Sequence, residues 1–169
     1  MSAKAKLLTS RKVFFINRPK NGTLVKSPTT AAGILFFKVI DGKIYLLLIS
    51  YNEKKYSLLD DLGGRAEVYD QSIFQTINRE VAEESNDLIQ VDSQNLQCNQ
   101  VYVADSKYLC LIVKLDSDAY QDTSIFGTFE STNKFERTIK WYEFTDQLKP
   151  QLSHRIRQSD IYDAIAQSI

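Results

Sequence analysis

Residues 63–87 read GGRAEVYDQSIFQTINREVAEESND, and this stretch decides the fold. Ser72 is followed three residues later by Gln75, which is the spacing of a capping box and predicts a helix over 72–86. Apolar side chains recur along this helix on one stripe at about 100° per residue, and we expect that stripe to face the core. Its members are Ile73, Ile77, Val81 and Leu88.

Acidic side chains form a second stripe beside the apolar one. They are Glu80, Glu83, Glu84 and Asp87, and no basic residue occurs between Arg79 and Lys107. Like charges at positions i and i+4 destabilise a helix by about 0.2–0.5 kcal/mol per pair, so uncompensated glutamates suggest a bound cation. Mg²⁺ prefers one or two carboxylates together with substrate phosphates, and Gly63-Gly64 would let a backbone carbonyl approach such an ion. The alternative is a solvent-exposed amphipathic helix with an acidic flank.

The same stretch resembles the signature of the Nudix hydrolases, the MutT-like pyrophosphohydrolases. That signature reads Gly-x5-Glu-x7-Arg-Glu-U-x-Glu-Glu-x-Gly-U, where U is aliphatic. The matching residues are Gly64, Arg79, Glu80, Val81, Glu83 and Glu84. The flanks are also similar to the family, since 31–49 resembles its first long hairpin and 139–142 its late strand. The resemblance covers roughly residues 30–169.

Three departures from the signature stand in this sequence. The loop acid is Asp70 rather than Glu, and eight residues rather than seven separate it from Arg79, which leaves Gln71 as the other candidate for that position. Asn86 and Asp87 replace the terminal glycine and aliphatic residue. Asn is the next-best left-handed C-cap after Gly, so the helix can still end there.

The resemblance implies an α/β class, with a Nudix-type α/β/α sandwich around a mixed β-sheet. It implies that Glu80 and Glu84 bind Mg²⁺ or Mn²⁺, assisted by Glu83 and the Gly63 carbonyl, and that Arg79 holds the glutamates in place. Divalent ions can neutralise the oxygens of a diphosphate, orient water and lower its pKa.

The carboxylate that takes the proton of the attacking water stays open between three residues. Glu80 and Glu136 are the two leading candidates and rank nearly equal, and Glu130 lies in the same late segment as Glu136.

Candidate substrate-binding residues are Arg65, Glu67 and Tyr102. Arg65 is the lone cation of the loop just upstream of the helix, and Glu67 matches an acid common in the family's loop. Tyr102 lies 16 residues after Asn86, near a tyrosine that dinucleoside-polyphosphate hydrolases often carry, although a strand tyrosine more often serves packing.

The expected activity is cleavage of a diphosphate linkage in a nucleoside diphosphate derivative by attack of water on phosphorus. Related readings are mRNA decapping and hydrolysis of inositol pyrophosphates or dinucleoside polyphosphates. A reading of another class is a nucleotide-sensing Nudix domain without turnover.

Elsewhere the sequence predicts strands interleaved with helices. Asp41-Gly42 between two apolar runs, 32–40 and 43–50, predicts a β-hairpin. Further strands are expected at 13–16, 56–59, 96–104, 108–115 and 138–144. Prolines and Asn21-Gly22 predict turns over 18–30, and a terminal helix is expected over 153–169.

Composition bounds the class of protein. The chain has 169 residues, of which 43% are hydrophobic, which fits one ordinary domain with a real core. No apolar stretch is long enough to cross a bilayer, and the first residues do not resemble a secretory signal. Two cysteines make no disulfide framework, and one histidine excludes sites that need more imidazoles. We expect a cytoplasmic protein that does not associate with membranes.

Charge is distributed unevenly along the chain. Eight lysines and arginines precede Asp41, the first acid, although the total charge is balanced. We therefore divide the chain into a basic N-terminal segment, 1–29, partly packed on the domain, and a Nudix domain, 30–169. The basic segment suggests a polyanionic partner, a polyphosphate small molecule or RNA, or else a frayed solvated end. A homodimer is possible because members of the family are often dimers.

Overall fold

A computed structural model describes residues 12–52, 58–132 and 134–169. Its main sheet has the order β6–β7–β3–β4–β8, and β5 pairs with the first part of β3. The strands are β3 (Ala31–Ile40), β4 (Lys43–Tyr51), β5 (Leu62–Arg65), β6 (Asn99–Val103), β7 (Tyr108–Lys114) and β8 (Arg137–Glu143). The pairing of β3 with β7 is parallel and the other pairings are antiparallel, so the sheet is mixed as predicted.

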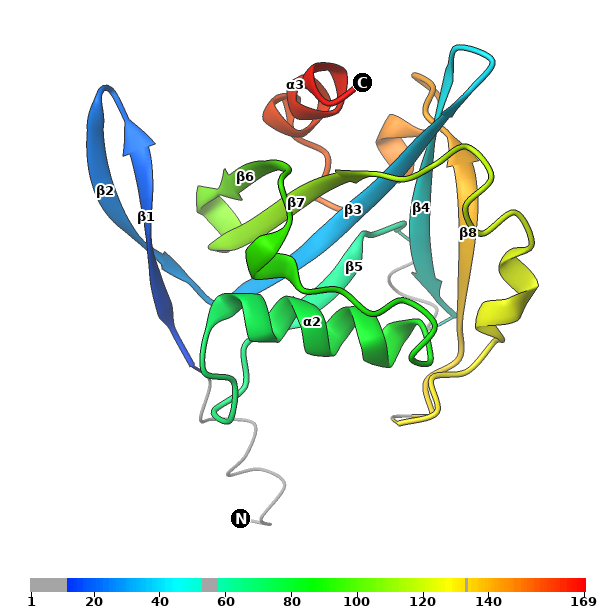
Figure 1. Cartoon of the computed structure of the whole chain (residues 1–169), viewed down its shortest axis with the longest axis horizontal. Coiled ribbons are helices and arrows are strands. Elements are labelled where there is room, and N and C mark those ends of the chain that lie inside the picture. The colour runs from blue at the N-terminus through cyan, green and yellow to red at the C-terminus, as the bar shows by residue number, and fades with distance from the viewer. Residues whose placement is uncertain (1–11, 53–57, 133) are drawn as a thin grey trace.

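Two helices cover the two faces of this sheet (Figure 1). Helix α2 (Ile73–Glu84) lies on one face and α3 (Ser159–Gln167) on the other. Short 3₁₀ helices stand in the connections: η1 (Ser93–Asn95), η2 (Ala104–Ser106), η3 (Thr123–Phe126) and η4 (Lys149–Gln151). The expected α/β/α sandwich is therefore confirmed.

The central strand β3 explains why both faces are apolar. Ala32, Ile34 and Phe36 pack on the side of α2, whereas the alternate residues Leu35 and Phe37 pack on the side of α3. A strand that is covered on both faces reads as a continuous apolar run, as β3 does.

The hairpin predicted at Asp41-Gly42 is confirmed. Ile40 pairs with Lys43, and both turn residues have positive φ, 51° for Asp41 and 77° for Gly42. Positive φ at both central positions is the type I′ geometry that matches the twist of the strands.

Helix α2 forms close to the predicted bounds. Ser72 caps it by accepting from the Gln75 amide at 3.2 Å, while the Gln75 side chain reaches the amide of Gln71 rather than that of Ser72. The helix ends before Asn86 and Asp87, which both have positive φ. Leu88 was predicted to face the core, but the prediction was wrong because the residue lies past the helix end and is exposed.

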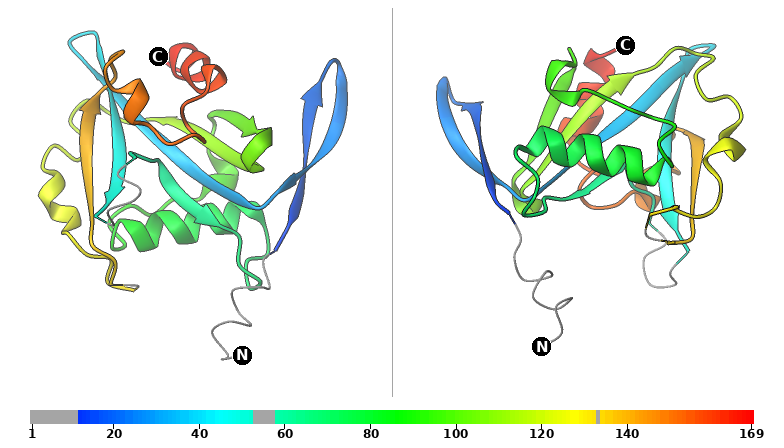
Figure 2. Two further views of the ribbon diagram at one scale, coloured as in Figure 1. Left: turned by 180° about the vertical axis from the view of Figure 1, so that it is seen from behind. Right: turned by 60° about the horizontal axis from the view of Figure 1, so that its bottom comes forward.

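The turns predicted over 18–30 were largely wrong. Two strands, β1 (Phe14–Lys20) and β2 (Thr23–Thr29), form a hairpin around Asn21-Gly22 that projects from the sandwich (Figure 2). Lys20 and Thr23 form the hydrogen-bonded pair that closes the turn, and hydrogen-bonded and non-hydrogen-bonded pairs alternate from there along the hairpin. Pro19 and Pro28 both fall in non-hydrogen-bonded pairs, where the backbone amide points away from the partner strand. The missing N–H groups therefore cost this ribbon no hydrogen bond.

The terminal helix starts later than predicted, at Ser159. The chain before it is tied to the start of the β5 segment, because Leu59 donates to Gln151 and Ser153 donates to Leu59, both at 2.8 Å. Within the strand predicted at 56–59, Tyr56 and Ser57 lie outside the described residues. No helix in the described part of the chain is both long and apolar enough to cross a membrane.

Candidate active site

The acidic residues of α2 face a cavity of about 460 Å³. Glu80 and Glu83 line it from the helix, and Glu130 lines it from the loop that follows η3. Among the described residues that line this cavity, Arg79 is the only cation. Together with Glu67 from the loop before α2, the cavity therefore gathers four carboxylates around one positive charge.

Gly64 is a glycine because of Glu80. A Cβ at Gly64 would overlap the Glu80 carboxylate, whereas a Cβ at Gly63 would overlap the Tyr108 hydroxyl and the backbone of β3 on the opposite side of β5. Alternate residues of a strand face opposite sides, so the two glycines serve different neighbours. The result is a close approach of Glu80 to the backbone of β5.

Glu84 is buried and held from two sides. Its Oε1 accepts from the Gly63 amide at 2.7 Å, and its Oε2 accepts from the Tyr51 hydroxyl. Burial raises the pKa of Glu84 well above its usual range, and the nearby charge of Glu80 adds to this effect. A buried carboxylate that contacts a backbone amide has little freedom to move.

Arg79 connects the loop before α2 to the acidic residues of the helix. It forms a bidentate pair with Asp70, at 2.9 and 3.0 Å, and also contacts Glu80 at 2.9 Å and Glu83 at 3.5 Å. Its guanidinium additionally donates to the Arg65 carbonyl at 3.0 Å.

Asp70 accepts further hydrogen bonds from the Thr76 hydroxyl and the Glu67 amide. Burial opposes its ionisation, but the bonds from Arg79, Glu67 and Thr76 outweigh burial and lower the pKa of Asp70. Asp70, rather than Gln71, thus takes the position that pairs with the arginine.

The two late glutamates are placed differently. Glu130 is buried, and its Oε1 accepts from the Tyr51 hydroxyl at 2.5 Å. Glu136 is exposed and lines a neighbouring cavity of about 340 Å³ together with Phe129 and Phe135. The structure therefore brings Glu130, and not Glu136, to the acidic cavity.

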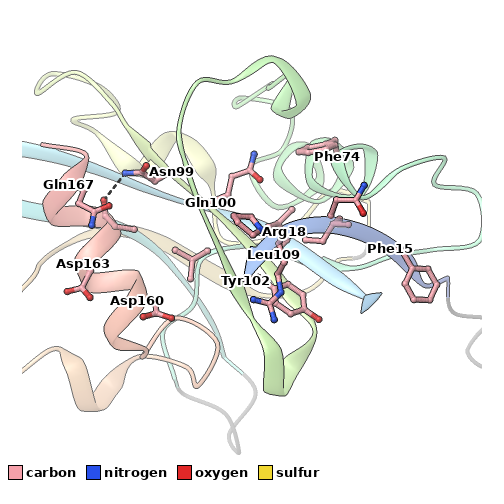
Figure 3. Close-up of a pocket in the computed structure, with 15 residues that line it drawn as sticks. Phe15, Arg18, Phe74, Asn99, Gln100, Tyr102, Leu109, Asp160, Asp163 and Gln167 are labelled. Atoms are coloured by element: carbon pink, nitrogen blue, oxygen red, sulfur yellow. Dashed lines mark hydrogen bonds between the residues drawn. The ribbon is translucent and has the colours of Figure 1, made fainter. Parts of the chain in front are cut away.

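The predicted substrate-binding residues do not all lie together. Glu67 lines the acidic cavity, whereas Arg65 is exposed at the end of β5 and is not among the described residues that line this cavity. Tyr102 lies elsewhere, in a cavity of about 710 Å³ between β1, β6 and α3 (Figure 3). There its hydroxyl donates to the Pro28 carbonyl at 2.5 Å, and the Arg18 guanidinium lies 4.7 Å from its ring centre. Tyr102 thus contacts the hairpin rather than the acidic residues.

The donor set can be tested against the expected metal ion. Burial raises the pKa of Glu80 to about 7, with Glu83 and Glu130 adding to the shift and Arg79 opposing it. Such a cluster carries more negative charge than Arg79 offsets, and oxygen donors of this kind suit Mg²⁺ or Mn²⁺. In the described part of the chain, however, no group of three or more acidic, His or Cys side chains is positioned to hold an ion. The carboxylate oxygens of this cluster are suitable ligands for a divalent cation. In the structure they accept hydrogen bonds from protein groups.

Comparison with solved structures identifies the fold. The Nudix domain of Shewanella oneidensis NrtR complexed with ADP ribose superposes with a TM-score of 0.52 at 18% identity, over 99% of both chains. The chain has the Nudix fold.

Two further structures share this Nudix fold with the chain. A C. elegans Ap4A hydrolase binary complex has a TM-score of 0.50 at 17% identity, covering 82% of this chain and 96% of that one. Whole Shewanella oneidensis NrtR has a TM-score of 0.52 at 19% identity, and the match spans 81% of this chain and 62% of that protein. No protein-family model matches the sequence, and no curated protein matches it.

Sequence reasoning missed several residues that build the site on this Nudix fold. Tyr51, at the end of β4, links Glu84 to Glu130 through its hydroxyl. Arg137, at the start of β8, donates to the Glu84 carbonyl at 2.7 Å and so holds the end of α2. Neither contact has a local sequence signal, because each joins residues more than 30 positions apart.

Proposed function

We propose that the protein is a divalent-metal-dependent pyrophosphohydrolase that cleaves a diphosphate linkage in a nucleoside diphosphate derivative. The observation that supports this most strongly is the convergence of four glutamates, Glu80, Glu83, Glu84 and Glu130, around Arg79 and Tyr51. Burial raises the pKa values of Glu80, Glu83 and Glu84, and desolvated carboxyl groups that line a cavity are more typical of a functional site than of a solvated helix.

Glu80, Glu83 and Glu84 would hold Mg²⁺ or Mn²⁺, together with the Gly63 carbonyl. Bound there, the ion would neutralise the diphosphate oxygens and help to activate the attacking water. The chain's own contribution is orientation: Gly63 and Tyr51 hold Glu84, and Arg79 holds Glu80 and Glu83.

Glu130 is the residue we propose as the proton acceptor. As the water oxygen bonds to phosphorus and the bridging P–O bond breaks, the Glu130 carboxylate takes the water proton. Its place in the acidic cavity beside Glu80 favours it over Glu136, which is exposed outside that cavity. Glu80 remains the alternative acceptor, since it lines the same cavity.

The walls of the site support a substrate with an aromatic base. Tyr69 and Phe135 are exposed rings that line the acidic cavity, and Phe135 also lines the neighbouring one with Phe129 and Asn52. Exposed aromatic faces can stack on a base. Arg65, exposed at the end of β5, stays a predicted phosphate contact. The solved structures with this fold include complexes named for Ap4A hydrolase and ADP ribose, so both ligands belong in a substrate panel.

A set of single substitutions tests the proposal. Glu84→Gln keeps the shape of a buried side chain but removes its charge, and turnover should fall by at least about 100-fold while the protein stays folded. Glu130→Gln should lower kcat, whereas Glu136→Gln, its matched control, should change kcat little. Equal losses in the two variants, or full activity in Glu84→Gln, would contradict the assignment.

A nucleotide sensor without turnover is the second candidate. The observation that favours it is that the acidic side chains already bond to Arg79, Tyr51 and Gly63. A sensor would bind nucleotide equally well with and without divalent ions, and Glu84→Gln would retain that binding. Calorimetric titration of ADP-ribose with Mg²⁺ or with a chelator separates the two.

RNA is the partner to test for the basic segment. β1, β2 and the residues beside them carry Lys12, Arg18, Lys20 and Lys26 and no acid. If capped RNA is a ligand, its affinity should fall steeply with salt concentration. The division at residue 29, a homodimer and a cytoplasmic location stay predictions.

A further inference from the structure

Asn86 stands where the Nudix signature has glycine, and its side chain contacts the loop that carries Glu130. Its Nδ2 donates to the Phe126 carbonyl at 3.0 Å and to the Phe129 carbonyl at 2.8 Å. Its Oδ1 accepts from the Ser131 amide at 2.8 Å. Two carbonyls and one N–H fit the amide in one orientation, with both donors and the acceptor engaged.

The backbone of Asn86 does not by itself require an asparagine. Its φ is 53°, a left-handed conformation that glycine adopts without strain and asparagine adopts more easily than other side chains. Glycine would therefore end α2 equally well. What asparagine adds at this position is the set of three bonds to the loop.

Those bonds bracket Glu130 in the chain. Phe129 and Ser131 are its immediate neighbours, and both are bonded to Asn86. Phe126 is held a second time by Arg137, which donates to its carbonyl at 2.8 Å and to that of Gly127 at 2.7 Å. Arg137 thus fixes the first part of the loop and Asn86 the part next to Glu130.

The position of this loop affects the acidic cavity, because the loop carries Glu130. The Tyr51 hydroxyl lies within hydrogen-bond distance of Glu130, at 2.5 Å, and also of Glu84, and its single proton serves one of the two carboxyl groups at a time. The position of the loop therefore sets the distance between two carboxyl groups of the site. A displacement of about 1 Å in a reacting group can cost about 100-fold in rate.

We infer that Asn86 is a positioning residue that fixes the end of α2 to residues 126–131 and thereby places Glu130 in the acidic cavity. The expected effect on catalysis rests on the proposed function, in which Glu130 accepts the proton. The attachment of residues 126–131 to the end of α2 by Asn86 depends on the fold alone.

The test compares Asn86→Gly with Asp87→Gly in the full chain. Asp87 is exposed and also has positive φ, 63°, so both variants place glycine where it is favoured, but only the first removes the bonds to the loop. Hydrogen exchange of the Ser131 amide, followed by NMR, should become at least about fivefold faster in Asn86→Gly, which corresponds to one net hydrogen bond. It should be unchanged in Asp87→Gly.

A third variant, Asn86→Asp, keeps an acceptor for Ser131 but removes both donors. Its Ser131 exchange rate should lie between those of the wild type and Asn86→Gly. Thermal unfolding checks that all three variants are folded.

Kinetics on a hydrolysed substrate complete the test. Asn86→Gly should lower kcat by about tenfold or more with KM within about twofold, as expected for a misplaced reacting group. Unchanged Ser131 exchange in Asn86→Gly, equal acceleration in Asp87→Gly, or a loosened loop with unchanged kcat would each overturn the inference. If the wild type hydrolyses nothing, the proposed function fails, and Ser131 exchange alone then decides whether Asn86 fixes the loop.

Discussion

At the scale of single residues, Gly63 and Gly64 face opposite sides of β5, and a side chain at each position would meet different neighbours. A side chain at Gly64 would meet the end of Glu80, which can swing away, whereas one at Gly63 would meet the backbone of Ala32 and Gly33, which cannot. A substitution at Gly64 should therefore affect mainly the acidic site, and a substitution at Gly63 should affect mainly the stability of the fold.

We predict that Gly64→Ala folds nearly as well as the wild type, with a loss of less than about 1 kcal/mol, but displaces Glu80 and weakens Mn²⁺ binding. Gly63→Ala should instead lose about 2–3 kcal/mol or more, because overpacking against backbone forces the strands apart. Urea unfolding and Mn²⁺ titration of both variants check this. Stability losses in the reverse order would contradict the assigned contacts.

Asp70 gives a prediction with a pH dependence. Its pKa is lowered in the folded protein below the usual 3.8, so its ionised form contributes stability above about pH 4, and this contribution is lost as the pH falls through the lowered folded-state value. Asp70→Asn should destabilise the protein by about 2 kcal/mol at pH 6–7, since charged hydrogen bonds are lost.

The measurement is the unfolding free energy of wild type and Asp70→Asn from pH 7 down to pH 3. The difference between them should be constant above about pH 5 and shrink below pH 4. A difference that grows on acidification would show that the Asp70–Arg79 pair does not hold the loop.

Several site residues could be read from the sequence because they lie close together on one helix. Glu80, Glu83, Glu84 and Arg79 share a face through helical spacing, which a sequence displays directly. Tyr51, Asn86 and Glu130 could not be assembled in this way, because the hydrogen bonds that place them join residues 79 and 43 positions apart.

At the scale of elements, the segment before α3 is joined to the segment before β5 by a buried ion network. Arg155 contacts Asp60 at 2.8 Å and Asp61 at 3.0 Å, and Asp61 also accepts from the Tyr108 hydroxyl at 2.7 Å. These contacts, with the bonds between Leu59 and Ser153, stop the terminal helix from starting at residue 153.

We predict that Arg155→Met lowers the free energy of unfolding by about 3–5 kcal/mol, because it leaves Asp61 buried without its cation. The matched control is Lys43→Met, which breaks the exposed pair with Glu143 and should cost less than about 1 kcal/mol. Chemical denaturation measures both. Similar small losses would mean that the network does not hold the terminal segment.

The helices and strands were predictable where the turn or cap residues and the pattern of apolar residues indicate the same element. The β3–β4 hairpin has both its turn residues and its apolar runs, and α2 has its cap. The β1–β2 hairpin was missed because prolines usually mark turns. A strand accepts proline where the backbone amide points away from the partner strand, and which positions these are is known only once the pairing is known.

At the scale of the whole molecule, α2 and α3 cover opposite faces of the sheet (Figure 1). The acidic residues of α2 face a cavity that is rich in carboxylates. If that cavity binds a divalent cation, the folded state gains stability by mass action.

We therefore predict that Mn²⁺ at about 100 times its Kd adds about 2.7 kcal/mol, a rise in Tm of roughly 5–10 °C for a chain of this size. Glu84→Gln should lose most of this rise. Scanning calorimetry with Mn²⁺, and with Ca²⁺ as a larger comparison ion, measures the effect. An equal rise in Glu84→Gln would place the ion elsewhere.

The measurement that tests the central claim most directly is ³¹P NMR of a substrate panel in ¹⁸O-labelled water with Mg²⁺. The panel holds ADP-ribose, Ap4A, nucleoside triphosphates, an inositol pyrophosphate and capped RNA. We predict that at least one diphosphate linkage is cleaved, that ¹⁸O enters one of the phosphate products, and that a chelator abolishes the reaction. A protein that binds one of these compounds and cleaves none of them would contradict the account.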